Sequence, residues 1–296
     1  MIHNSIKGLI VETNILKALQ PTVTFGGAAG LIIYRTPLIC FPFSFLLRRG
    51  VKDITMALTA ISIESAQKLF GDGSDYGVTI RYKTIDGPSF LAKEIMEDSD
   101  YYKDSKIIYV SANTVISGKE MRKSTKELLE SDYEQATIFG KRVPSPHNHE
   151  TMIIDQCGKI LSFEKCEEAT NPEFSCLSIP KMGFYPADIT KVVRSLSESF
   201  IRKSHRPINQ TYLDADNLRH IYLHSNEIWT EINSFDSIHH LSSKLHDYFH
   251  SHKIIIGSPE LNAILGGLIE HDQFFQIIQK YKGTDYYDLL LENSTI

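Results

Sequence analysis

The stretch "GLIVETNILKAL", residues 8–19, indicates the fold class and raises a question about function. Residues 6–11 form a short aliphatic run that predicts a buried strand, and residues 16–19 predict a helical or turn segment behind it. A nucleotide-binding α/β protein usually places glycines after its first strand, because backbone N–H groups must approach phosphate closely. Here residues 12–15 read Glu-Thr-Asn-Ile. The chain is therefore either no nucleotide binder or one that has lost this chemistry.

Strand and helix patterns alternate through the first half of the chain. Strands are predicted at residues 6–11, 53–59, 78–83 and 106–111, and helices at residues 37–49, 62–70, 88–97 and 119–129. Such alternation is typical of βαβ units. We therefore predict an α/β fold with a doubly wound, mostly parallel sheet.

From about residue 134 the pattern becomes richer in strands. Further strands are predicted at residues 136–143, 151–165 and 174–185, the middle one as a hairpin turning at residues 156–159, and helices at residues 186–196, 213–223 and 235–251. A helical tail, residues 258–293, starts at Ser258-Pro259-Glu260, which suits an N-cap, a first helical position and a first-turn acid. We predict an α/β domain over residues 1–252, with a β-rich insertion, and a helical C-terminal appendage over residues 253–296.

Composition narrows the functional classes. Hydrophobic residues at 42% and charged residues at 23% are typical of a soluble globular protein. A net charge of −5 without a basic stripe argues against a nucleic-acid or membrane-surface partner. The longest apolar run, residues 38–47, contains Pro42 and is too short to span a bilayer, so we expect a cytoplasmic protein. The four cysteines form no C-x-x-C pair and are expected to be reduced thiols.

Several longer stretches resemble a known family. They are "YRTPLICFPFSFLLRRGVKDI" (residues 34–54), "FGDGSDYGVTIRYK" (residues 70–83), "DQCGKILSFEK" (residues 155–165) and the tail "GSPELNAILGGLIEHDQFFQIIQKYKGTDYYDLLLEN" (residues 257–293). Their order and spacing resemble the sugar nucleotidyltransferase superfamily, in particular bacterial glucose-1-phosphate thymidylyltransferases. The tail is most similar to the tetrameric branch of these enzymes.

The resemblance implies a reaction in which a sugar phosphate attacks the α-phosphate of a nucleoside triphosphate and releases pyrophosphate. The protein's part in such a reaction is to position phosphates and neutralise charge. The family's glycine-rich phosphate loop falls on residues 12–17, where Glu12 has appeared and the arginine position is taken by Lys17. The two lysine positions of the next element fall on Ala28 and Thr36. The catalytic positions at Lys17, Ala28 and Thr36 are therefore degenerate. A fourth degenerate position, Asn113, belongs to the metal site described below.

Two substitutes for the missing groups can be considered. The glycine run "FGGAAG", residues 25–30, is one candidate for a displaced phosphate loop, but no strand precedes it and we interpret it as a flexible connector. Arg35, by swinging towards the phosphates, is a candidate replacement for a lost lysine. We regard both as the weaker alternatives.

The metal site implied by the resemblance is also altered. The first Mg²⁺-binding aspartate falls on Asn113, which offers an oxygen but no charge. The second falls on Glu231, which keeps the charge on a longer side chain and is a weak metal candidate. No resident cofactor is therefore expected, and Mg²⁺ only if the protein is active.

Two segments remain as substrate-binding candidates. Gly71, Asp72, Gly73, Ser74 and Asp75 correspond to a base-reading segment, although a structural turn that caps the preceding helix is the simpler interpretation. Glu164 and Lys165 lie near the family's sugar-phosphate contacts, shifted by one residue.

Histidines outside these motifs suggest little chemistry. His246 and His250 have the i, i+4 spacing of metal ligands, but a solvated helix face explains them equally well. His147, His149 and Glu150 are expected in a polar loop.

Three functions follow from these observations. The first is a catalytically inactive homologue with a regulatory, assembly or ligand-binding role, the second an enzyme with residual or altered nucleotidyl transfer, and the third a scaffold that binds another protein. Expected partners are a second copy of the chain, with the tetramer as the candidate state, or an active homologue. A nucleotide or sugar phosphate is the expected small ligand.

Overall fold

The computed structural model describes residues 5–13, 17–131, 133–143, 149–164, 174–197 and 206–294. The chain divides into two compact units. The first comprises Met1–Ile6, Ser89–Val110 and Ser117–Trp229, and the second Lys7–Pro88, Ser111–Ile116 and Thr230–Ile296. The predicted boundary near residue 252 is a different division and stays a prediction.

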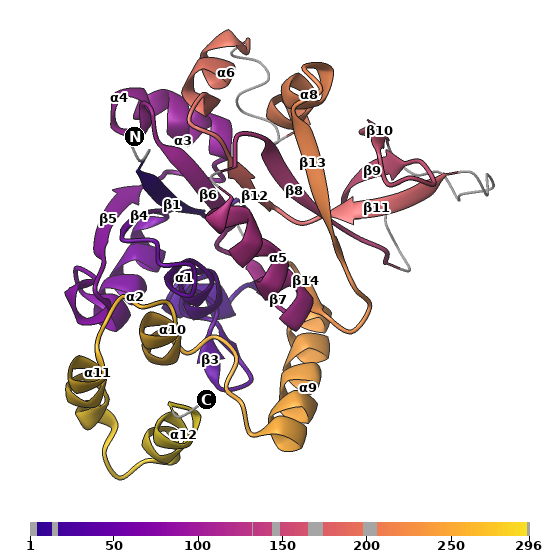
Figure 1. Ribbon diagram of the computed structural model, residues 1–296. Coiled ribbons are helices and arrows are strands. Elements are labelled where there is room, and N and C mark those ends of the chain that lie inside the picture. Colours follow the sequence, from indigo (N-terminus) through magenta and orange to yellow (C-terminus); the bar gives the residue numbers. More distant parts are fainter. Residues whose placement is uncertain are drawn as a thin grey trace. The chain divides into compact units, whose positions relative to one another are not determined.

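The second unit contains parallel strands that were predicted in the N-terminal part of the chain. Strand β4 (Asp53–Leu58) lies between β1 (Ile6–Val11) and β5 (Thr79–Thr84), and both pairings are parallel. Helix α1 (Cys40–Leu47) precedes β4, and helix α2 (Ala60–Phe70) connects β4 to β5 (Figure 1). This βαβ order confirms the predicted α/β class.

A short hairpin precedes α1 in this unit. Strands β2 (Ile32–Ile33) and β3 (Thr36–Pro37) are antiparallel, and Tyr34 and Arg35 form the turn between them. The helix predicted from residue 37 therefore begins three residues later, at Cys40. Two 3₁₀ turns, η1 (Lys17–Leu19) and η2 (Thr22–Phe25), lie between β1 and the hairpin.

The second unit ends in a long helix and a helical tail. Helix α9 (Phe235–His252) is followed by α10 (Pro259–Leu265), α11 (His271–Ile278), η5 (Gln279–Tyr281) and α12 (Asp285–Asn293). Ser258 is the N-cap of α10 and accepts a hydrogen bond from the Leu261 N–H, with Pro259 in the first turn, as predicted. Helix α10 packs on α1 (Figure 1).

The first unit contains the β-rich part of the chain. Its strands follow the order β10 (Ile160–Ser162), β9 (Glu150–Ile154), β11 (Ser175–Ile179), β8 (Ala136–Lys141), β12 (Met182–Tyr185) and β6 (Lys106–Ser111). Their pairings are antiparallel, and the predicted hairpin between β9 and β10 turns at residues 156–159. The described helices of this unit are α3 (Leu91–Glu97), α4 (Ser99–Tyr102), α5 (Lys119–Glu130), α6 (Ile189–Ser195) and α8 (Arg206–Asp214).

One predicted helix is wrong. Residues 213–223 were expected to be helical, but α8 ends at Asp214 and Leu218–Leu223 form strand β13. Strand β13 pairs in parallel with β8 along its full length, from Leu218 opposite Ala136 to Leu223 opposite Lys141. Pairing with β8 therefore decided the conformation of this segment, and such a partner cannot be read from local periodicity.

The short strands β7 (Thr114–Ser117) and β14 (Ile228–Glu231) lie where the chain passes from one unit to the other. Neither was predicted.

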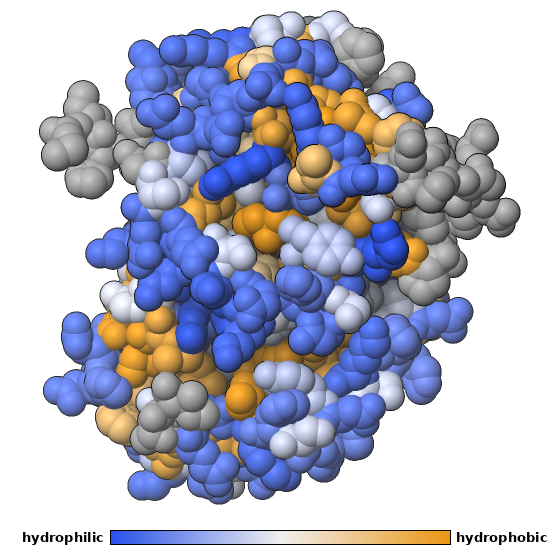
Figure 2. Space-filling model, turned by 45° about the vertical axis from the view of Figure 1, so that its right-hand side comes forward, coloured by the Kyte–Doolittle hydropathy of each residue, from blue (hydrophilic) through white to orange (hydrophobic). Residues whose placement is uncertain are grey.

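No helix among the described residues is long and apolar enough to cross a membrane. On the face drawn in Figure 2, apolar residues reach the surface as patches separated by polar ones.

Among the described cysteines, one differs from the prediction. Cys40 and Cys157 are free thiols, the first buried and the second exposed. Cys176, in β11, is disulfide-bonded. The expectation that all four are reduced is therefore wrong for Cys176, because the absence of a C-x-x-C motif does not exclude a bond between cysteines that folding brings together.

Candidate nucleotide site

The Glu12 side chain, at the end of β1, forms hydrogen bonds that stabilise the fold. Its backbone N–H donates to the Ala57 carbonyl at 2.9 Å, which continues the β1–β4 pairing by one residue. Its Oε2 atom accepts hydrogen bonds from the N–H and the hydroxyl of Thr59, both at 3.0 Å. Thr59 is the N-cap of α2, so the carboxylate lies at the positive end of that helix dipole. The helix end where an anionic ligand would be stabilised thus already holds a protein carboxylate.

The rest of this first loop is only partly described. Residues 14–16 lie outside the described part of the chain. Lys17, at the predicted arginine position, begins η1 and is exposed. Thr13 is buried, and its hydroxyl lies 2.9 Å from that of Ser111.

The glycine run at residues 25–30 is a closely packed turn, so the interpretation as a flexible connector is wrong. The Ser65 hydroxyl of α2 donates to the Gly26 carbonyl at 2.9 Å. Gly27 has a φ of +64°, and a Cβ there would lie 2.1 Å from the Ser62 Oγ atom. These glycines permit close contact with α2, and Ala28, at the predicted lysine position, is buried in the same turn.

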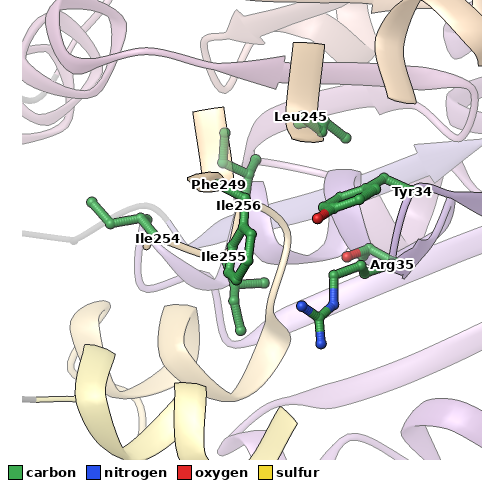
Figure 3. A pocket seen from close by; sticks show the side chains of 8 residues that line it. Tyr34, Arg35, Leu245, Phe249, Ile254, Ile255 and Ile256 are labelled. Atoms are coloured by element: carbon green, nitrogen blue, oxygen red, sulfur yellow. The ribbon is translucent and has the colours of Figure 1, made fainter. Parts of the chain in front are cut away.

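The hairpin tip directs Arg35 towards α9. The Tyr34 N–H donates to the Ser242 hydroxyl at 3.1 Å, which fixes the tip against that helix. The Arg35 guanidinium lies over the Phe249 ring, 5.1 Å from its centroid (Figure 3). Arg35 is therefore held by α9 in this structure, which does not favour its use as a substitute phosphate ligand. Thr36, at the second lysine position, is buried in β3.

Asn113 is the most unusual residue of the site. It follows β6, and the Ser111 hydroxyl accepts a hydrogen bond from its backbone N–H at 3.3 Å. The side chain is buried, with 4% of the residue exposed, yet neither its oxygen nor its nitrogen has a hydrogen-bond partner among the described residues. Leaving such groups unpaired costs about 1–3 kcal/mol each, which makes Asn113 a candidate contact for a polar ligand.

The residues around Asn113 do not fit a resident Mg²⁺ ion. The Ile232 N–H donates to the Asn113 carbonyl at 2.9 Å, so the chain directly after Glu231 lies against Asn113. This arrangement offers one neutral oxygen and one carboxylate, whereas Mg²⁺ is bound mainly through carboxylates and substrate phosphates. Within the described ranges no group of three His, Cys, Asp or Glu residues is arranged to hold a metal ion.

The Gly71–Asp75 segment forms a turn that contacts the tail. Gly71 is the C-cap of α2, as the structural interpretation predicted. The Asp72 carboxylate accepts hydrogen bonds from the N–H and hydroxyl of Ser74, and these bonds lower the pKa of Asp72. Gln273 of α11 donates to the carbonyls of Ser74 and Asp75 at 3.2 and 3.3 Å. The contacts support a structural turn, and the nucleotide-binding role of these residues stays a prediction.

The first unit contains a polar cavity that the sequence did not predict. It is small, with room for about one water molecule, and its lining includes Tyr109, Glu150, Lys181, Tyr185 and Asn209. The Tyr185 hydroxyl donates to the Asn209 side chain at 3.0 Å, while burial and the nearby Glu150 carboxylate raise the pKa of Tyr185. These side chains come from separate elements, so no spacing in the sequence could have revealed them.

The remaining predicted residues give little further geometry. Lys165 lies outside the described residues, as does His147. Glu164 contributes its backbone carbonyl to a hydrogen bond from the Thr151 hydroxyl. The His149 ring lies 4.9 Å from that of Trp229, so His149 is in a ring contact and not only in a polar loop. His246 and His250 lie on an exposed face of α9 with ring centroids 4.2 Å apart.

Comparison with known proteins establishes the relationship that these motifs suggested. A family model described as nucleotidyl transferase matches residues 29–248. The chain belongs to the nucleotidyl transferase family. It is 26% identical over 290 residues to a glucose-1-phosphate thymidylyltransferase of Mycolicibacterium smegmatis, an alignment that covers 97% of this chain and 98% of the relative. A glucose-1-phosphate thymidylyltransferase of Xanthomonas campestris pv. campestris is 24% identical over 282 residues, or 95% of this chain and 94% of the relative.

Solved structures show the same fold. A crystal structure described as a glucose-1-phosphate thymidylyltransferase from Bacillus anthracis, in complex with a sucrose, superposes with a TM-score of 0.72. The match covers 86% of this chain and 98% of that one at 19% identity. The nucleotidyl transferase fold of that structure is thus shared over most of this chain.

Proposed function

We propose that this nucleotidyl transferase family member is a catalytically inactive homologue of glucose-1-phosphate thymidylyltransferase, with a regulatory, assembly or ligand-binding role in sugar-nucleotide metabolism. The observation that supports this proposal most is that the Glu12 side chain already binds another part of the chain. Its carboxylate accepts two hydrogen bonds from Thr59 at the start of α2. A fixed negative charge next to the expected triphosphate position opposes the binding of a polyanion.

The loss of cations strengthens the proposal. At the two lysine positions Ala28 and Thr36 are both buried and uncharged. Phosphoryl-transfer centres depend on fixed positive charge to stabilise the transition state, and removing one such group commonly costs orders of magnitude in rate. No replacement is supplied by Arg35, which is held on Phe249.

An active enzyme with altered chemistry is the second candidate, and Asn113 favours it. A buried carboxamide with no partner among the described residues is costly to keep unless something binds to it. If the protein is active, Mg²⁺ would enter together with the substrate phosphates, and the reaction would be transfer of a nucleotidyl group to a sugar phosphate.

The decisive experiment measures pyrophosphate release from dTTP and glucose 1-phosphate in the presence of Mg²⁺. The Mycolicibacterium smegmatis relative is the positive control. We expect no release above a no-enzyme blank. Clear turnover would refute the inactive assignment and support the second candidate.

A thermal-shift measurement separates ligand binding from a closed scaffold. A ligand that binds only the native state must raise the melting temperature. We expect a shift with dTTP or glucose 1-phosphate if the ligand-binding role is right. No shift with either, together with no turnover, would favour a scaffold that binds another protein.

We further propose self-association or association with an active homologue through the tail. Leu261 and Phe274 are already buried within the chain, whereas Leu265 and Phe275 keep 40% and 42% of their surface exposed. The apolar surface left for a partner is therefore smaller than the sequence suggested. Light scattering on the protein alone and mixed with the active relative tests this, and a strict monomer in both samples would contradict it.

A further inference from the structure

A cavity within the second unit belongs to none of the predicted sites. It lies between the start of α1, the end of α2 and the helical tail, and its volume is about 210 Å³. Its lining includes Cys40, Phe70, Tyr76, Glu260, Tyr281 and Tyr286. We propose that this tail cavity binds a small organic cation, meaning an apolar ring or short chain that bears a primary ammonium group.

The tyrosine hydroxyls in the wall of the tail cavity already use their hydrogens within the protein. Tyr281 donates to the Glu260 Oε1 atom at 3.0 Å, and Tyr286 donates to the Oε2 atom at 2.8 Å. The Tyr76 hydroxyl donates to the Leu69 carbonyl at 3.4 Å. A tyrosine hydroxyl has one hydrogen, so these three oxygens can only accept further hydrogen bonds. The polar part of the wall therefore favours a ligand that donates hydrogen bonds.

Glu260 gives the tail cavity a negative charge. Only 2% of its surface is exposed, and the Ser258 hydroxyl also donates to its Oε2 atom, at 3.1 Å. Among the described residues no lysine, arginine or histidine forms an ion pair with it. Burying a carboxylate without a positive partner is unfavourable. The Oε1 atom accepts only the Tyr281 hydrogen bond, so a ligand ammonium would supply both a second donor and the missing positive charge.

The charge of Glu260 acts on side chains all around the cavity. Burial and the Glu260 carboxylate together raise the pKa of the Tyr76, Tyr281 and Tyr286 hydroxyls and of the Cys40 thiol. The carboxylate therefore disfavours any further negative charge on the wall. The same field attracts a cation that enters the cavity.

The rest of the wall suits an apolar group. The rings of Phe70 and Tyr76 lie edge to face with centroids 6.0 Å apart, and those of Tyr281 and Tyr286 do so at 5.0 Å. Aromatic rings bury hydrocarbon groups favourably, and their faces attract cations. A cavity of about 150 Å³ holds benzene, so the tail cavity has room for a ring with one short substituent.

Arg35 borders the tail cavity but does not neutralise Glu260. Its guanidinium lies over the Phe249 ring of α9, and it forms no ion pair in the described part of the chain. A like charge near the cavity opposes the entry of a cation. Removing the charge of Glu260 should therefore weaken cation binding, whereas removing that of Arg35 should not.

The test uses isothermal titration of the full chain with three probes of similar shape. Benzylammonium carries a ring and a positive charge, benzyl alcohol carries the same ring without charge, and benzoate carries a negative charge. We expect benzylammonium to bind at least about tenfold more tightly than benzyl alcohol, because charge-assisted hydrogen bonds are stronger than neutral ones. Benzoate should bind more weakly than both. Undetectable benzylammonium binding, or binding no tighter than that of benzyl alcohol or benzoate, would overturn the proposal.

Charge variants assign the binding to the tail cavity. Glu260→Gln is expected to weaken benzylammonium binding by about tenfold or more, with a much smaller effect on benzyl alcohol. The matched control is Glu270→Gln, which removes an exposed carboxylate of the same tail and should bind like the original protein. Arg35→Gln should bind benzylammonium at least as tightly as the original protein. Unchanged binding in Glu260→Gln, or weaker binding in Arg35→Gln, would show that the assignment is wrong.

A further variant keeps the proposal testable if Glu260→Gln does not fold. Cys40→Leu adds aliphatic volume to the wall of the cavity and changes no charge there. It should weaken binding of both benzylammonium and benzyl alcohol, and circular dichroism should show an unchanged fold. A folded Cys40→Leu protein that binds both probes like the original would mean that they bind elsewhere, which contradicts the proposal. The proposal does not depend on the proposed function, since these readouts are binding constants, and absence of pyrophosphate release leaves them unaffected.

Discussion

The end of β1 lacks the glycines of the family's motif, whereas the turn after α2 keeps them. The glycine-rich loop expected after β1 is gone, and Glu12 instead binds Thr59 at the start of α2. The turn after α2 keeps its glycines, and Gly73 and Gly77 have φ values of +92° and +69°. The first set of glycines would serve a ligand, whereas the second set serves the fold.

This difference has a physical basis. A Cβ at Gly77 would lie 2.2 Å from the Leu268 carbonyl oxygen in the tail, so substitution there would cost stability whether or not any ligand binds. Glycines that only let phosphate approach impose no such cost once phosphate binding is not required. Motifs that hold the chain together therefore persist after motifs for chemistry have changed.

The largest effect is expected for Gly77→Ala. The substitution combines a left-handed backbone with a clash against a backbone atom, and we expect a loss of roughly 2–5 kcal/mol in the free energy of unfolding. Gly71→Ala is the matched control, because Gly71 also has a positive φ but a Cβ there would meet nothing within 4 Å. It should cost only about 1–2 kcal/mol. Urea denaturation of both variants tests this, and equal losses would contradict the packing argument.

A smaller loss is expected for Glu12→Ala. Removing the carboxylate leaves the Thr59 N–H without its acceptor at the N-terminus of α2, which should lower the free energy of unfolding by about 2–3 kcal/mol. Glu64→Ala, on the exposed face of the same helix, is the control and should leave stability unchanged. A neutral result for Glu12→Ala would mean that the carboxylate is available for another role.

Stability should also fall in alkali. Burial and the nearby Glu260 carboxylate raise the pKa of Tyr281 and Tyr286 in the tail, and burial raises the pKa of Tyr82 to about 12. Because the folded-state pKa values lie above the unfolded value of about 10, the contribution of these groups is full below about pH 10 and is lost as the pH rises further. Tyrosinate absorbance followed with pH should show ionisation delayed in the native protein and released on unfolding. Ionisation of every tyrosine near its ordinary pKa, with the fold intact, would contradict this.

The smallest effect is expected for Asn113→Asp on activity. Restoring one carboxylate beside Glu231 should restore neither Mg²⁺-dependent dTTP binding nor turnover, because groups that act as a unit are not additive. A glycine-rich loop at residues 12–17 combined with Ala28→Lys and Asn113→Asp has a better chance. The structure adds that Ala28→Lys places an ammonium in a buried turn. Titration of dTTP with and without Mg²⁺ tests the single variant, and strong Mg²⁺-dependent binding would show an intact pocket.

Much of the fold could be predicted from local sequence. The structure confirms the strands predicted at residues 6–11, 53–59, 78–83 and 106–111, the hairpin turn at residues 156–159, helix α9 and the Ser258 N-cap. All of these depend on residues that are close together in the chain. Strand β13 was missed because its conformation depends on pairing with β8. The glycine run at residues 25–30 was misread because its partner, α2, lies more than thirty residues further along the chain.

The α/β class, the family and the replacement of residues expected at a phosphate and metal site could all be read from the sequence. What the replacement residues do depends on the tertiary structure. Glu12 binds at a helix end, Ala28 fills a packed turn, and Arg35 lies on an aromatic ring. The physical reason is that hydrophobic periodicity is a local property, whereas the partner of a charged or polar side chain is set by residues brought together from distant parts of the chain.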